Sequence, residues 1–155
     1  MPYVGLGSLL PDVAARETRV ARSQGEGGLP AGEYAFVELF CDEAHCDCRR
    51  TFIQVWGPSS AKNPEARRLA TISYGWESED FYRRWAKYPL DAEELAELKG
   101  PALISTDSQS QLAPLLLRMF QHLLLDEAYA RRLVRHDEMF QAAAFARRTS
   151  GEDLS

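Results

Sequence analysis

The sequence has little lysine, no excess of positive charge and no long apolar run. Its 155 residues carry 23 acidic side chains against 18 basic ones, and the formal net charge is −5 at pH 7. Proteins that bind nucleic acids through the phosphate backbone usually carry a basic excess, so this balance disfavours that class. No stretch approaches the roughly 18 apolar residues of a membrane-spanning helix, so we expect no membrane span.

The N-terminus has no features of a secretion signal. Residues 1–10 contain no basic leader, and two glycines interrupt their short apolar run. Hydrophobic residues make up 45% of the chain and charged residues 26%, values typical of a soluble globular protein. We therefore expect a cytoplasmic protein that folds as a single domain over residues 1–155.

Three cysteines, Cys41, Cys46 and Cys48, lie within the eight residues CDEAHCDC. Their odd number argues against a disulfide framework in a reducing compartment. In an extended segment, residues i and i+2 point to the same side, so Cys46 and Cys48 can direct two sulfurs to one point. The four intervening residues, DEAH, are long enough to reverse the chain and bring Cys41 close to Cys46 and Cys48. The C-x4-C-x-C spacing therefore predicts a metal-binding knuckle, with zinc (Zn2+) as the ion.

Other interpretations of the cysteines stay open. They could be buried thiols that fill the core, a redox pair, or a nucleophile activated by His45. The adjacent acidic residues Asp42, Glu43 and Asp47 should raise the thiol pKa values and disfavour a reactive free thiolate. A divalent cation would relieve the same repulsion, so the acidic surroundings favour a metal.

A closed structural zinc site needs a fourth ligand. The chain has three histidines, His45, His122 and His136. His136 lies near the centre of an apolar helical stripe and must therefore enter the core. We predict His136 as the fourth ligand, ahead of His45 and His122. Water in that position is the alternative, and it would make the site catalytic.

Alternating apolar residues predict a small antiparallel sheet over residues 34–76. Segments 33–41, 48–56 and 68–76 each read as strands with one apolar face. In 68–76, Thr71 and Ser73 fall on the opposite face, which we expect to be exposed to solvent. Residues 57–66 read as a polar turn. Residues 1–33 are rich in Gly, Pro and Ser and read as a loop-rich segment, with a short strand near 17–22.

Helical periodicity begins after Trp76 and extends to about residue 147. Ser78, Asp91 and Asp126 are predicted helix caps, and Glu94 stands at the capping-box position after Asp91. The helices form the C-terminal half, residues 77–147, and the fold class is α+β. The Arg doublets read mostly as solvated or ion-paired, but Arg49 or Arg50 can donate hydrogen bonds to the knuckle.

The order LPAGEYAFVELFC, DEAH, CDCRR, followed by a long apolar helix and RLVRHDEMF, resembles a group of uncharacterised bacterial proteins. The likeness spans about residues 11–141, and its specific parts are CDCRR at 46–50 and RHDEMF at 135–140. The resemblance implies a small α+β domain, and many such proteins carry a C-terminal SEC-C zinc motif. No cysteine follows Cys48, so that motif is absent here.

These observations predict a zinc-binding protein with Cys41, Cys46, Cys48 and His136 as ligands. The zinc is expected to be structural, to link the loop between two strands to the last helix, and to serve a protein-interaction role. One alternative is a zinc-dependent hydrolase with an open fourth position and Asp42 or Glu43 as the base. Another is a nucleic-acid-binding module that uses the Arg doublets.

Overall fold

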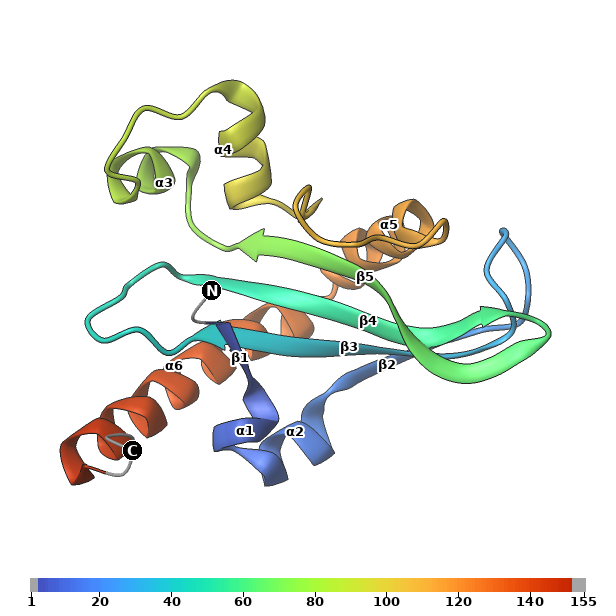
Figure 1. Cartoon of the computed structure of the whole chain (residues 1–155), viewed down its shortest axis with the longest axis horizontal. Coiled ribbons are helices and arrows are strands. Elements are labelled where there is room, and N and C mark those ends of the chain that lie inside the picture. Colours follow the sequence, from blue (N-terminus) through green and yellow to red (C-terminus); the bar gives the residue numbers. More distant parts are fainter. Residues whose placement is uncertain (1–2, 152–155) are drawn as a thin grey trace.

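A computed structural model describes residues 3–151 and contains one sheet flanked by helices (Figure 1). The strands are β1 (Tyr3–Gly5), β2 (Arg19–Ser23), β3 (Gly32–Cys41), β4 (Arg50–Ser60), β5 (Asn63–Gly75) and β6 (Ala102–Leu103). The helices are α1 (Leu6–Leu9), α2 (Pro11–Glu17), α3 (Glu79–Trp85), α4 (Ala92–Lys99), α5 (Ala113–Leu123) and α6 (Glu127–Ser150). The predicted α+β class, a small antiparallel sheet followed by a helical C-terminal half, is confirmed.

The sheet is antiparallel and is built around the long strands β3, β4 and β5. Its strand order is β1-β3-β4-β5-β6, and β2 also pairs with β3. Strand β1 pairs with the end of β3 that carries Cys41, while β2 pairs with the beginning of β3 at Gly32. Residues 3–23 therefore complete one edge of the sheet, next to the predicted knuckle.

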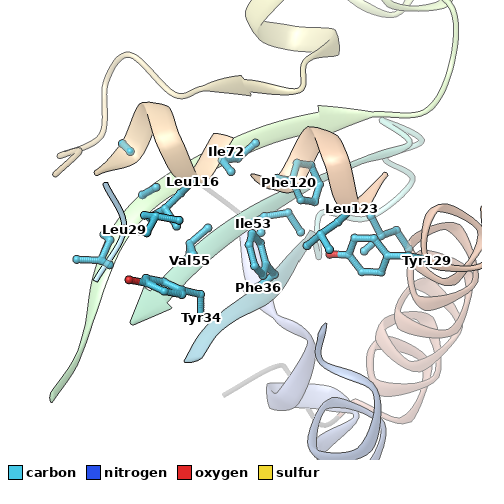
Figure 2. Close-up of a cluster of buried hydrophobic side chains, with 14 residues drawn as sticks. Leu29, Tyr34, Phe36, Ile53, Val55, Ile72, Leu116, Phe120, Leu123 and Tyr129 are labelled. Carbon is cyan, nitrogen blue, oxygen red and sulfur yellow. The ribbon is translucent and has the colours of Figure 1, made fainter. Parts of the chain in front are cut away.

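One face of the sheet carries the main hydrophobic core (Figure 2). Along β3, Tyr34, Phe36 and Phe40 are fully buried, as their alternation predicts. Phe36 packs on Phe120 of α5 with ring centroids 6.1 Å apart, and Phe120 meets Tyr129 of α6 edge-on. The apolar stripes of both helices thus cover the same face of the sheet.

A second, smaller cluster lies where α6 passes the end of β3. Phe40 and Phe140 pack with ring centroids 5.6 Å apart, and Leu6 from α1 and Ala144 from α6 complete the buried set. In Figure 1, α6 runs along the sheet past α1, while α3 and α4 lie beyond the opposite edge. This packing holds the N-terminal segment against the last helix.

The sequence signals for helix starts are confirmed. The Ser78 side chain accepts a hydrogen bond from the Phe81 backbone N–H at the start of α3. Asp91 and Glu94 form a reciprocal capping box on α4, and the Asp126 side chain caps α6. These caps satisfy backbone donors that have no partner within the helix.

Two expectations about loops were wrong. Within residues 3–31, the structure has β1, α1, α2 and β2 where a loop-rich segment was expected. Of these elements only β2 was predicted, as the short strand near 17–22. The segment 57–66 was expected to be a polar turn. Instead β4 and β5 stay paired out to Ser60 and Asn63, so the connection is only two residues long.

Thr71 and Ser73 of β5 were expected on a solvent-exposed face. Both are buried, with exposed fractions of 2% and 0%. The Gln109 side chain lies against the Thr71 backbone, and Arg50 donates to the Ser73 hydroxyl. The second face of the sheet is therefore covered near the end of β5.

Candidate metal centre

The three cysteines converge at the end of the β3–β4 hairpin. Their sulfur atoms all lie within 4.8 Å of one another, and no other His, Cys, Asp or Glu among positions 3–151 joins this group. Cys41 is the last residue of β3, and Cys48 lies two residues before β4. The predicted convergence of Cys41, Cys46 and Cys48 is confirmed.

The connection between the strands folds back through tight turns, without the extended Cys46–Cys48 pair that we expected. The backbone N–H of Cys46 donates to the Glu43 carbonyl oxygen. His45 and Arg49 have φ angles of 62° and 48°, the left-handed region that residues other than glycine rarely adopt. These reversals, one on either side of Cys46, bring the three sulfurs close together.

Exposure differs sharply among the three thiols. Cys41 and Cys48 are 3% and 4% exposed, whereas Cys46 is half-buried. The acidic neighbours Asp42 and Glu43 are exposed on the outside of the loop. The site therefore has a closed inner side against the sheet and one accessible cysteine.

The inner side is closed by Tyr3 of β1. Its hydroxyl oxygen lies 3.4 Å from the Cys48 sulfur and accepts a 3.2 Å hydrogen bond from Arg50. The buried Arg50 guanidinium also donates to the Ser73 hydroxyl and to the Leu98 carbonyl. The sequence suggested that Arg49 or Arg50 would support the knuckle, but no spacing pattern indicated Tyr3.

Arg49 supports the loop from outside. Its guanidinium contacts the Asp47 carboxylate at 2.9 Å and the Glu77 carboxylate at 3.1 Å. The Arg49 carbonyl accepts a 2.7 Å hydrogen bond from the Tyr82 hydroxyl of α3. These contacts fix the chain immediately after Cys48.

The thiols have different proton affinities because they hydrogen-bond one another. The pKa of Cys48 is lowered to about 6, first by the hydrogen bond from the Cys41 thiol. The Tyr3 hydroxyl, the Cys46 thiol and the Arg50 charge act in the same direction, while burial opposes them. The pKa values of Cys41 and Cys46 are raised, mainly by the hydrogen bond to Cys48 and by burial, respectively. The acidic loop residues do not account for these shifts, contrary to expectation.

The donor set fits a thiolate-binding metal ion. In a tetrahedral zinc site, Zn–S bonds of about 2.3 Å place the sulfurs about 3.8 Å apart. The observed upper limit of 4.8 Å requires only a small contraction of the loop to reach that separation. Cys41, Cys46 and Cys48 are therefore three possible ligands to one ion.

His136 does not join the cysteines. Its Nδ1 lies 2.6 Å from Glu38 Oε1 and its Nε2 lies 2.9 Å from Glu17 Oε1. Both ring nitrogens are thus occupied, and the predicted bridge from His136 to the metal is not formed. The prediction that His136 is buried on the core face of α6 is confirmed, since its exposed fraction is 0%. Its partner there is a buried carboxylate on β3.

The other two histidines lie in different surroundings. His122 is exposed on α5, far along the chain from the cysteine loop. His45 is exposed within the loop itself, next to Cys46 in sequence. Of the three histidines, only His45 belongs to the segment that carries the cysteines.

The last helix still reaches the loop, through residues that the sequence did not suggest. Gln141 donates a 2.9 Å hydrogen bond to the Cys41 carbonyl, and Arg148 donates a 2.8 Å bond to the Asp42 carbonyl. Gln141 also donates to the Asp137 carboxylate. Burial, aided by the negative charge of Cys48 and Asp47, raises the pKa of Asp137 to about 6.

Two cavities flank the exposed side of the loop, and Cys46 lines both. One, of about 620 Å3, is bounded on the α6 side by Gln141, Phe145 and Arg148. The other, of about 700 Å3, is bounded by Glu43, by Trp85 at the end of α3 and by the residues that follow it, including Tyr88. Space next to the cysteines is therefore available on two sides.

Within residues 3–151 no helix is both long enough and apolar enough to cross a membrane. Comparison of the chain with protein-family models, with curated proteins and with solved structures finds no match.

Proposed function

We propose that this protein binds one zinc ion through the thiolates of Cys41, Cys46 and Cys48, and that the zinc is structural. The observation that carries the proposal is the convergence of three sulfurs within 4.8 Å in a chain that has only three cysteines. Thiolate ligands select zinc among the common divalent ions of a reducing cytoplasm, the compartment that we expect for this chain. The fourth position is assigned to His45 or to water.

The surroundings of the cysteines support a structural role. The ligands connect the end of β3 to the start of β4, and contacts from β1, α3 and α6 all end on this loop. A metal ion bound here holds together segments that are distant in sequence. We propose that the loop surface so fixed, with the exposed Tyr88 and Phe145 on either side, contacts a protein partner.

A zinc hydrolase is the second candidate. One observation favours it: Cys46 and the Glu43 carboxylate line the same cavity, so a zinc-bound water and a base can share it. Asp47 is less suitable as the base because it is paired with Arg49. The nucleic-acid-binding alternative, in which arginines bind phosphate, receives less support. Five arginines pair with carboxylates: Arg22, Arg49, Arg83, Arg131 and Arg135.

Metal analysis of protein purified without chelator tests the proposal. We expect about one zinc per chain, and cobalt substitution should give the intense sulfur-to-metal absorption of a thiolate-rich tetrahedral site. Cys48→Ser should lose the metal. His136→Gln is the matched control and should retain it in the folded fraction, because both imidazole nitrogens point to carboxylates. Folded, metal-free protein with three titratable thiols would refute the proposal.

His45→Ala separates the two assignments of the fourth ligand. If His45 binds the metal, the cobalt spectrum shifts when the imidazole is removed. If water occupies the position, the spectrum stays the same, and added imidazole or azide changes it by displacing the water. An exchangeable water together with hydrolysis of an activated ester would favour the enzyme.

A further inference from the structure

The three cysteines differ in access, and this difference has a chemical consequence for the metal site. Cys41 and Cys48 are buried behind Tyr3 and the sheet, while Cys46 is half-buried and lines both cavities. A metal-bound cysteine is a thiolate whatever its pKa in the free protein. Access, and not proton affinity, therefore decides which of the three sulfurs reacts first with a molecule from solvent.

We propose that Cys46 is an oxidation site through which a neutral hydroperoxide releases the bound metal. The inference rests on the proposed metal site and adds its regulation. The Cys46 thiolate attacks the distal oxygen of the peroxide and breaks the O–O bond. The products are a sulfenic acid on Cys46 and an alkoxide or hydroxide, which takes a proton from water.

A buried neighbour then completes the reaction. The thiolate of Cys41 or Cys48, each within 4.8 Å of Cys46, attacks the sulfenic sulfur and expels hydroxide. Two thiolates have lost two electrons and the peroxide has gained them. Only one thiolate remains, together with His45 if its imidazole is the fourth ligand, and so few protein ligands do not hold zinc against solvent. The metal leaves, and a dithiol reductant that reduces the disulfide restores the site.

Charge on the loop selects the class of oxidant. The charged side chains around Cys46 are Asp42, Glu43 and Asp47 against Arg49, Lys87 and Arg148, and three thiolates bound to one Zn2+ add a net charge of −1. The mouth of the loaded site is therefore slightly negative. An anionic oxidant such as glutathione disulfide is repelled, while hydrogen peroxide and small alkyl hydroperoxides are uncharged. We therefore expect peroxide to react faster than glutathione disulfide at equal concentration and low ionic strength.

Alkylation of the zinc-loaded protein with limiting iodoacetamide tests the access argument. Peptide mass spectrometry should find Cys46 modified at least tenfold faster than either buried cysteine. Tyr3→Ala removes the cover over Cys48 and keeps all three cysteines, and at a zinc concentration that saturates the variant it should raise alkylation of Cys48 selectively. Equal labelling of all three cysteines in the wild-type protein would overturn the proposal.

Peroxide treatment tests the chemistry. A chromophoric chelator should report about one zinc released per disulfide formed, and the disulfide should contain Cys46. A Cys41–Cys48 disulfide with Cys46 intact, or a disulfide formed without zinc release, would overturn the inference and leave the metal site standing. Failure to find metal before oxidation would instead refute the proposed function. Equal rates with peroxide and glutathione disulfide would overturn the choice of oxidant.

Discussion

The imidazole of His136 lies 2.6 Å from the carboxylate of Glu38, and both side chains are fully buried. His136 comes from α6 and Glu38 from β3, so the pair joins the last helix to the sheet. Burial of an ionised carboxylate is costly unless it is paired and hydrogen-bonded. The histidine on the apolar stripe of α6 is therefore explained by Glu38 and not by a metal ion.

Glu17, at the end of α2, contacts the other nitrogen of the ring at 2.9 Å. A neutral imidazole has a single N–H and can donate to only one of two carboxylates. The arrangement therefore favours the doubly protonated ring. The positive charges that act on these two carboxylates come from α6: Arg135 acts on Glu17, and Arg132 acts on Glu38.

The stability contributed by His136 should depend on pH. Burial opposes protonation, but the contacts with Glu38 and Glu17 prevail and raise the histidine pKa. A raised pKa in the folded state stabilises the protein below the ordinary value of about 6.5, and this stabilisation is lost as the pH rises through the folded-state pKa. His136→Gln should thus cost about 3 kcal/mol of unfolding free energy near pH 6, and less at alkaline pH.

Urea unfolding of both proteins across this pH range measures the difference. Glu17→Gln serves as a control whose effect on stability has the opposite pH dependence, because the hydrogen bond to His136 lowers the Glu17 pKa. The stabilisation that Glu17 contributes to the wild-type protein is present above about pH 4.5 and disappears as the pH falls. A cost of His136→Gln that increases with rising pH would contradict the assignment of a protonated ring.

Tyr3 should tune the affinity of the metal site. Tyr3→Phe removes the hydroxyl beside Cys48 and keeps the ring, which stacks on Phe52 with centroids 3.9 Å apart. Loss of an outer hydrogen bond to a metal ligand typically weakens binding 10- to 100-fold. Competition with a chromophoric chelator should show a weakening in this range, with a small change in unfolding free energy, about 1 kcal/mol. An unchanged affinity would show that the hydroxyl does not support the ligand.

Removal of the metal should lower the melting temperature. Metal binding and folding are linked, and the proposed ion connects β3, β4 and the contacts from α6. We expect chelation to reduce the melting temperature by more than about 5 °C, which corresponds to roughly 2 kcal/mol for a chain of this size. Hydrogen exchange should increase first in the cysteine loop. An unchanged melting temperature would indicate a peripheral site.

Gly75 is the position on β5 that leaves room for Tyr82. A Cβ atom at Gly75 would overlap the Tyr82 hydroxyl, which donates to the Arg49 carbonyl after the last cysteine. Gly75→Ala should therefore cost about 1–3 kcal/mol of unfolding free energy and weaken metal binding. Gly7→Ala on α1 is the control, because its Cβ would meet the nearest atom at an ordinary 3.5 Å. Equal unfolding midpoints for the two variants would contradict this packing argument.

Local patterns predicted much of this structure. The alternation in 33–41, the caps at Ser78, Asp91 and Asp126, and the cysteine spacing all depend on residues close together in sequence. Hydrogen bonds within one turn and side-chain alternation along one strand are set by local geometry. For this reason the α+β class and the clustering of the cysteines could be read from the chain alone.

Three thiols near one point and a buried histidine on the last helix could thus be predicted from sequence patterns. The packing of the folded chain was needed to show that His136 faces Glu38 and Glu17, which precede it by 98 and 119 residues. It was likewise needed to show that Tyr3, Arg50 and Gln141 close the cysteine loop. A polar side chain on a buried face needs a hydrogen-bond partner, but the residues near it in the sequence do not identify that partner. The pairing is set by which strand and helix pack together, and packing depends on the whole core.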